Sequence, residues 1–179
     1  MNDKKARTRE RILDAARSAL ILHGPAEPSV GQVMGAAGLT VGGFYAHFES
    51  KDALMLEAFS QLLCERRALL REVDPALNGE ARRALVAAFY LSRKHRDATE
   101  HACPLPTSLS EMSRLPDDFR QVLAEHIELM TAELADSPED ADKVLADLAL
   151  MVGGLALARA LGSDELSDRV LRAAKSAVI

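Results

Sequence analysis

Thr40 and Val41, near the front of the chain, carry groups that could read the edge of a DNA base. The Thr40 hydroxyl can hydrogen-bond a phosphate or a base edge, and the Val41 side chain can contact a thymine methyl group. Gly42 and Gly43 follow directly, and glycine lets a backbone come close to another molecule. Chemistry of this kind needs a rigid element that holds the residues against a groove.

Residues 29–51 are predicted to supply that element. Ser29 and Gln32 have the spacing of a capping box, which begins a helix. Gly38 is suited to end that helix in a left-handed conformation. Thr40 is predicted to cap a second helix after a short turn. Two helices joined in this way form a helix-turn-helix, whose second helix can enter the DNA major groove.

The sequence GLTVGGFYAHFESKDAL, residues 38–54, resembles the recognition-helix signature of the TetR family of bacterial transcriptional regulators. The upstream run RERILDAARSALILHG, residues 9–24, resembles the first helix of that family. The resemblance implies an all-α fold with two domains. Residues 1–50 would form a three-helix helix-turn-helix DNA-binding domain, and residues 51–179 a helical effector-binding and dimerisation domain.

The resemblance also implies which side chains touch DNA. Tyr45 and His47 match family positions that contact phosphates, and Lys51 matches the basic residue at the next helix start that does likewise. Gly42-Gly43 departs from the commoner pattern of a polar or basic residue beside a single glycine. Backbone approach, methyl contact and DNA shape are therefore expected to carry more of the specificity. The predicted DNA-binding residues are Ser29, Thr40, Val41, Gly42, Gly43, Tyr45, His47 and Lys51.

Charge is distributed in a way that fits a DNA-facing front end. The net charge is −5, yet residues 1–51 carry seven Lys or Arg against five acids, and residues 52–179 carry fifteen against twenty-two. A basic arm runs into the first predicted helix, residues 8–22, and is either a solvated terminus or a phosphate contact. The arm consists of Lys4, Lys5, Arg7, Arg9 and Arg11.

Composition favours helices and argues against secretion. Hydrophobic residues make up 48% of the chain and aromatic residues 4%, with no Trp. Two cysteines are too few for a disulfide scaffold, and the charged start does not read as a signal peptide, so a cytoplasmic location is expected. No metal-binding spacing is found among the five histidines, and no cofactor is predicted.

Further helices are predicted behind the helix-turn-helix, and the one over residues 138–161 is hydrophobic nearly all round. Asp147 and Arg159 interrupt it, so a membrane span is rejected. Gly153-Gly154 predicts close approach of a second backbone. The resemblance implies that the last two helices form a four-helix bundle with a second copy of the chain. Predicted interface residues are Val152, Gly153, Gly154, Leu157 and Leu171. The other helices are expected at residues 51–72, 80–96, 107–114, 117–135 and 164–177.

An effector pocket is expected inside the body helices, where Leu85, Ala88 and Phe89 are predicted to point inward. Cys103 follows His101 at a predicted helix start and is either a reactive sensor of electrophiles or oxidants, as in some family members, or a small buried hydrophobic residue. The predicted pocket residues are Phe89, Cys103, Met112, Phe119, His126 and Met130.

These observations predict a homodimeric repressor that binds a palindromic operator in double-stranded DNA and releases it when a small apolar or electrophilic effector binds. Two alternatives remain. One is a helical interaction or carrier protein that has lost DNA binding. The other is an enzyme using Cys103 with His101 or His126, which the absence of a nucleophile elbow, a phosphate loop or telling paired carboxylates disfavours. The helix over residues 51–72 is expected to couple the effector to DNA.

Overall fold

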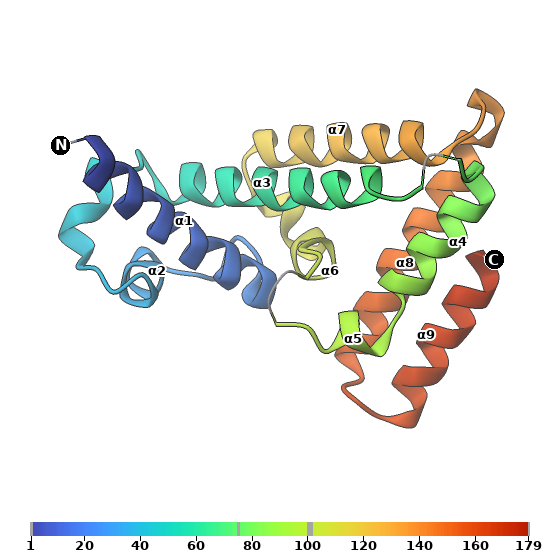
Figure 1. The fold of residues 1–179 in the computed structure, drawn as a ribbon. Coiled ribbons are helices and arrows are strands. Elements are labelled where there is room, and N and C mark those ends of the chain that lie inside the picture. Colours follow the sequence, from blue (N-terminus) through green and yellow to red (C-terminus); the bar gives the residue numbers. More distant parts are fainter. Residues whose placement is uncertain (1, 75, 100–101, 179) are drawn as a thin grey trace. The chain divides into compact units, whose positions relative to one another are not determined.

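The protein is described by a computed structural model over residues 2–74, 76–99 and 102–178, and all regular elements in these ranges are helical. His101 lies outside the described residues. The elements, drawn in Figure 1, are α1 (Asn2–His23), α2 (Val30–Ala36), η1 (Val41–Ala46), α3 (Lys51–Arg71), α4 (Gly79–Tyr90), α5 (Arg93–Arg96), α6 (Leu105–Ser108), η2 (Leu109–Arg114), α7 (Asp117–Leu134), η3 (Pro138–Asp140), α8 (Ala141–Ala160) and α9 (Glu165–Val178). The predicted all-α fold is confirmed.

The chain divides into two compact units. The first comprises Met1–Cys64 and Cys103–Val122, and the second comprises Glu65–Ala102 and Leu123–Ile179. Both α3 and α7 contribute residues to each unit. The division expected at residue 50 is a functional one, and it stays a prediction.

In the first unit, α1 supplies one wall of the core. Ile12, Leu13, Ala16 and Leu20 recur at helical spacing and are all 0% exposed. Gly24, at φ 77°, follows the last turn and donates its N–H to the Leu20 carbonyl at 2.9 Å. The helix therefore ends where the sequence predicted, although it begins earlier, at Asn2.

The proline-bearing segment after Cys103 packs with the first unit. α6 contacts α1, and the Thr107 hydroxyl donates to the Leu20 carbonyl at 3.4 Å. Phe119, near the start of α7, is 0% exposed, with its ring centroid 5.9 Å from that of Phe59 in α3. Part of the predicted effector domain thus belongs to the same compact unit as the N-terminal helices.

In the second unit, α8 and α9 lie side by side and run in opposite directions (Figure 1). A side-chain carbon added at Gly154 would lie 2.8 Å from the Ala174 Cβ and 3.2 Å from a methyl carbon of Leu91. Glycine at this position therefore permits the close packing of α9 on α8. The sequence predicted that another helix packs closely on Gly153-Gly154. At Gly154 this helix is α9 of the same chain.

A buried ion pair explains the acid that interrupts α8. Asp147 and Arg83 have nearly buried side chains and lie 3.2 Å apart (Oδ2 to Nε), while Lys143 Nζ lies 3.0 Å from the same carboxylate. Arg83 also donates from Nη1 to the Leu134 carbonyl at 2.9 Å. Breaking such a pair would leave a buried charge unmatched. Within the described residues, none of the helices combines the length and hydrophobicity that a membrane crossing needs.

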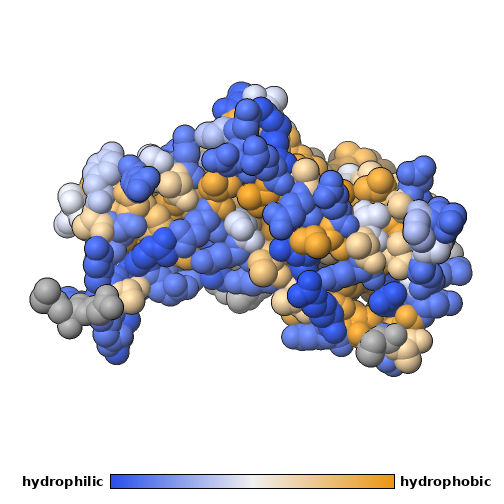
Figure 2. Space-filling model, turned by 90° about the horizontal axis from the view of Figure 1, so that it is seen from above, coloured by the Kyte–Doolittle hydropathy of each residue, from blue (hydrophilic) through white to orange (hydrophobic). Residues whose placement is uncertain are grey.

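The inward face of α4 differs from the prediction. Figure 2 shows a face of the molecule on which hydrophobic residues lie exposed among hydrophilic ones. On α4, Leu85 is 50% exposed, Phe89 is 58% exposed, and Ala88 is exposed as well. The buried residues of this helix are Gly79, Arg83 and Ala87. The expectation that Leu85, Ala88 and Phe89 point inward is wrong for the single chain, because the helix turns its charged Arg83 toward Asp147 instead.

Two histidines in the second unit are buried in their neutral form. His95 is 4% exposed, and its Nδ1 lies 2.8 Å from the Tyr90 carbonyl, to which it donates. Burial lowers the pKa of His95 to about 4, with Arg159 and Arg66 acting in the same direction. His126 is 3% exposed, and burial together with Arg67 lowers the pKa of His126 to about 4.

We predict that the free energy of unfolding falls as the pH drops from 6.5 toward 4. Over this window the unfolded chain binds protons at these two histidines and the folded chain does not, so acid favours unfolding. Each histidine should contribute roughly 1–3 kcal/mol to the loss. Urea titrations at a series of pH values measure it.

The matched variants are His126→Gln and His23→Gln. His126 accepts at Nδ1 from Arg67 Nη1 at 2.9 Å, and a glutamine oxygen can replace that acceptor without titrating. His23 is more than half exposed. The pH dependence should become shallower in the first variant and stay as it was in the second; equal slopes in both would contradict the assignment.

Candidate nucleic-acid interface

The helix-turn-helix begins with the predicted cap. Ser29 Oγ accepts from the Gln32 N–H at 3.2 Å, and Gln32 Oε1 accepts from the Ser29 N–H at 2.8 Å, so the capping box is confirmed. Gly38, at φ 66°, follows the end of α2, as predicted. The Leu39 N–H then reaches the Met34 carbonyl at 2.8 Å. These local bonds fix the direction in which the chain enters the second helix.

The second helix is a 3₁₀ helix, η1, rather than an α-helix. Thr40 stands at its N-cap through its backbone, and its side chain makes no capping hydrogen bond, so the predicted hydroxyl cap is wrong. The exposed Thr40 hydroxyl is left to face solvent. Val41 is 51% exposed and Tyr45 is 73% exposed, while Phe44 is 0% exposed. The element therefore turns one side toward the core and the other outward.

Gly42 and Gly43 lie on the exposed side of η1. A side-chain carbon at Gly42 would meet nothing within 4 Å, and one at Gly43 would meet only Met34 Cε at 3.9 Å. Neither glycine has a positive φ. The fold of the single chain therefore has room for a side chain at either position.

An aromatic cluster holds η1 against its neighbours. The Phe44 and Phe48 rings stack with centroids 6.0 Å apart, and the Arg9 guanidinium lies 4.6 Å from the Phe48 centroid. Arg9 also pairs with both carboxylate oxygens of Glu57, at 2.7 Å from Nη1 to Oε1. The hydrogen bond to Glu57 raises the pKa of Arg9 above its ordinary value. Phe44 and Phe48 are core residues, as expected.

The predicted basic arm is largely helical, and several of its basic side chains are bound to other residues of the chain. Arg9 is held by Glu57, Arg7 pairs with Asp3, and Arg11 Nη2 donates to the Ala37 carbonyl at 2.6 Å. A sequence pattern could not have revealed the bond between Arg9 and Glu57, because the two residues are separated by 48 positions.

His47 directly follows η1, and Lys51 is the first residue of α3. His47 Nδ1 is buried and has no hydrogen-bond partner, which favours the tautomer that carries its proton on Nε2. Lys51 Nζ donates to the Ala26 carbonyl at 2.6 Å. An ammonium has three donors, so Lys51 can hold Ala26 and still contact a phosphate.

The predicted effector residues are divided between the two units. Cys103, Met112 and Phe119 are buried in the first unit, and His126 and Met130 are buried in the second. Phe89 is exposed and lines no interior of the single chain. Cys103 is 3% exposed, a burial typical of a small hydrophobic residue. The pocket stays a prediction.

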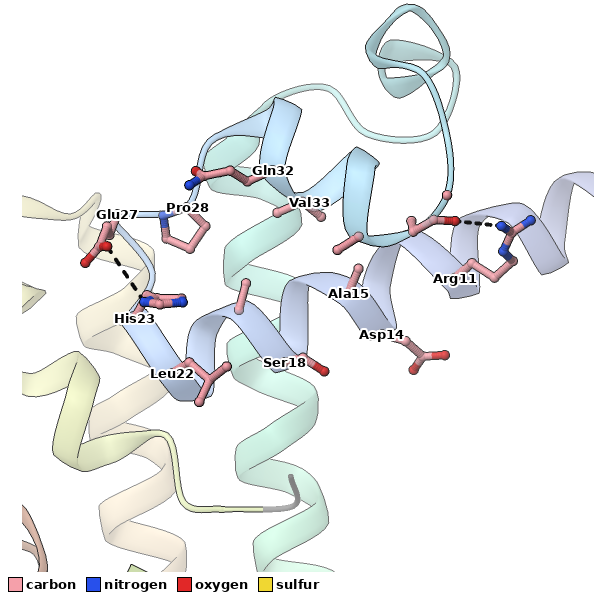
Figure 3. Close-up of a pocket in the computed structure, with 14 residues that line it drawn as sticks. Arg11, Asp14, Ala15, Ser18, Leu22, His23, Glu27, Pro28, Gln32 and Val33 are labelled. Atoms are coloured by element: carbon pink, nitrogen blue, oxygen red, sulfur yellow. Dashed lines mark hydrogen bonds and ion pairs between the residues drawn. The ribbon is translucent and has the colours of Figure 1, made fainter. Parts of the chain in front are cut away.

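A groove of about 720 Å³ lies between α1 and α2 (Figure 3). Its rim carries the contact between His23 and Glu27 at one end and the bond from Arg11 to the Ala37 carbonyl at the other. Another cavity, of about 510 Å³, lies between the end of α7 and the start of α8. None of the predicted effector residues lines either one.

The predicted dimer residues separate into two groups. Gly153 and Leu157 are exposed, Leu157 by 54%, and Val152 is half-buried. Gly154 and Leu171 are buried between α8 and α9 of the same chain. The interface assignment of all five residues stays a prediction.

Comparison with known proteins agrees with this architecture. Residues 12–58 match the family described as bacterial regulatory proteins, tetR family. The chain is 26% identical over 166 residues to YerO of Bacillus subtilis (strain 168), described as an uncharacterized HTH-type transcriptional regulator. That alignment covers 87% of this chain and 54% of YerO, so the chain spans about half the length of that relative.

Solved structures share the fold along nearly the whole chain. The reduced form of E. coli NemR superposes with a TM-score of 0.80 at 20% identity, covering 96% of this chain and 95% of that one. A TetR-family transcriptional regulator from Agrobacterium tumefaciens superposes with a TM-score of 0.79 at 20% identity, covering 97% and 98%. The segment that matches the family described as bacterial regulatory proteins, tetR family, residues 12–58, is the segment that contains the capped helix-turn-helix.

Proposed function

We propose that this protein is a DNA-binding transcriptional regulator that places η1 in the major groove of an operator. The outward side of η1 carries this proposal. A short element with Phe44 anchored in the core presents Thr40, Val41 and Tyr45 to solvent. In a helix-turn-helix the second helix is the one that enters the groove.

Each outward group has a role that suits its chemistry. The Tyr45 hydroxyl, the Nε2–H of His47 and the Lys51 ammonium donate to phosphate oxygens and position the protein. Thr40 and Val41 face the base edges. Ser29, exposed at the start of α2, offers a further hydroxyl to the backbone of the DNA.

Binding to the DNA upstream of its own gene tests the proposal. Fluorescence anisotropy should show tight binding that weakens steeply as salt rises, because phosphate contacts release counterions. Tyr45→Phe keeps the ring and should weaken binding by about tenfold to a hundredfold, the worth of one hydrogen bond to a charged group. Failure of the wild-type protein to bind any promoter duplex at low salt would favour an interaction protein instead.

Gly42→Ala is predicted to weaken DNA binding without lowering the stability of the fold. The added methyl group has open space in the chain, and alanine restricts the unfolded state, so the melting temperature should stay constant or rise. Operator affinity should fall by about tenfold, because the methyl group would stand between the backbone and the groove.

Gly35→Ala is the matched control, since its added carbon also meets nothing within 4 Å and it lies in α2, outside the predicted contact set. This variant should gain similar stability and keep operator affinity. If both variants bind as the wild type does, close backbone approach at Gly42 is refuted.

We also propose that the regulator is a homodimer joined through α8 and α9. Beyond their contact with each other, both helices expose a second apolar stripe at spacings of three and four residues. Two copies of this face would form a four-helix bundle with two-fold symmetry. The stripe consists of Ala146, Ala149, Gly153, Leu157 and Ala160 on α8 and of Leu166, Ala173, Ala177 and the half-buried Val170 on α9.

Gly153→Arg is predicted to separate the dimer into folded monomers. A side-chain carbon at Gly153 meets nothing within 4 Å in the chain, so the protomer has room for arginine, whereas an apolar interface does not accept its charge. Analytical ultracentrifugation measures the change, and circular dichroism checks the fold.

The neighbouring Gly154→Ala supplies the contrast. Its new methyl group would clash with Ala174, so this variant should melt at a lower temperature while its folded form stays dimeric. An unaltered sedimentation profile for Gly153→Arg would place the interface elsewhere.

Repression relieved by a small apolar or electrophilic effector completes the proposal. Support comes from α3, which begins directly after the helix-turn-helix and contributes to both compact units. A ligand that binds one arrangement of α3 better than another would change operator affinity by that difference. The buried side chains of Cys103, Met112 and Phe119 in one unit, and of His126 and Met130 in the other, remain the proposed contacts.

A further inference from the structure

In the loop between α1 and α2, Ala26 makes hydrogen bonds with two charged side chains. The Ala26 N–H donates to Glu111 Oε2 at 2.9 Å, and the Ala26 carbonyl accepts from Lys51 Nζ at 2.6 Å. Glu111 belongs to η2, and Lys51 is the first residue of α3. One peptide segment thus links η2 to the helix that follows η1, through two hydrogen bonds to charged groups.

Gly24 shows how closely η2 approaches this loop. It has φ 77°, and a side-chain carbon there would lie 2.5 Å from Glu111 Oε2 and 3.0 Å from the Thr107 carbonyl oxygen. The loop conformation and the space for the carboxylate therefore both depend on glycine. This contact between Glu111 and the loop is a packed junction, to which Thr107 adds its bond to the Leu20 carbonyl.

The path of the chain connects this junction covalently to the second unit on both sides. The segment that carries Glu111 packs with the first unit, yet the chain arrives from the second unit at Ala102 and returns to it at Leu123 along α7. A change in the second unit can therefore reach the helix-turn-helix through η2, independently of α3.

We propose that Glu111 is a positioning residue through which η2 holds the helix-turn-helix in its DNA-reading arrangement, by way of Ala26 and Lys51. This inference rests on the proposed DNA-binding function. Loss of the carboxylate releases the Ala26 N–H and leaves the hydrogen bond from Lys51 to the Ala26 carbonyl in place. The start of α2 and the start of α3 can then shift relative to each other, and η1 lies between them.

The test compares Glu111→Ala, Glu111→Gln and Asp118→Ala in the full chain. Asp118 is an exposed carboxylate in the same unit, so its removal changes the net charge equally without touching the loop. Three quantities are measured: hydrogen exchange of the amides from residues 24 to 36, affinity for the promoter duplex, and affinity for a scrambled duplex at low salt.

Glu111→Ala should exchange faster at the Ala26 amide and through α2, and should bind the promoter about tenfold more weakly, the worth of one charge-assisted hydrogen bond. Its affinity for the scrambled duplex should stay constant, because phosphate contacts tolerate small shifts. Glu111→Gln can still accept from Ala26 and should recover most of the loss, and Asp118→Ala should match the wild type.

Equal promoter affinity in Glu111→Ala and the wild type would overturn the inference while leaving the proposed function intact. A parallel loss on both duplexes, with a lower melting temperature, would reduce Glu111 to a stabilising residue and also overturn it. If the wild-type protein binds no duplex, the proposed function fails and this inference fails with it.

Discussion

The helix that is proposed to read DNA is six residues long and cannot be stable by itself, so it depends on the burial of Phe44. A 3₁₀ helix this short has few internal hydrogen bonds to hold it. The stacked Phe48 and the Arg9–Glu57 pair surround that anchor. Because one aromatic side chain faces inward, the residues on either side of it must face out, and these are the groups that could meet a groove.

The two units differ in the interactions that stabilise them. The first positions a small exposed element by means of specific contacts, several of which involve charged side chains bound to backbone carbonyls or amides. The second buries an apolar core around α8 that accommodates the ion pair of Arg83 with Asp147. The chain passes between the two units three times, within α3, between Ala102 and Cys103, and within α7.

Local signals made much of this fold predictable from the sequence. The capping box at Ser29, the left-handed Gly38 and the helical spacing in α1 each act within a few residues, and each is found as expected. Long-range partners were not predictable in this way. The pairs Arg9–Glu57 and Ala26–Glu111 join residues far apart in sequence. The inward face of α4 was misassigned because a sequence pattern places an arginine on the exposed side, whereas Arg83 is buried with its partner Asp147. The 3₁₀ form of η1 was missed because a run this short carries no distinguishing period.

Hydroxyl-radical footprinting of the protein on its own promoter tests the central claim most directly. Two copies of an exposed η1, related by two-fold symmetry, should protect two patches on one face of the duplex, with centres about 34 Å apart, or one helical turn. The protected sequence should be an inverted repeat. A single protected patch, or uniform weak protection that follows no sequence, would contradict a paired reading of the groove.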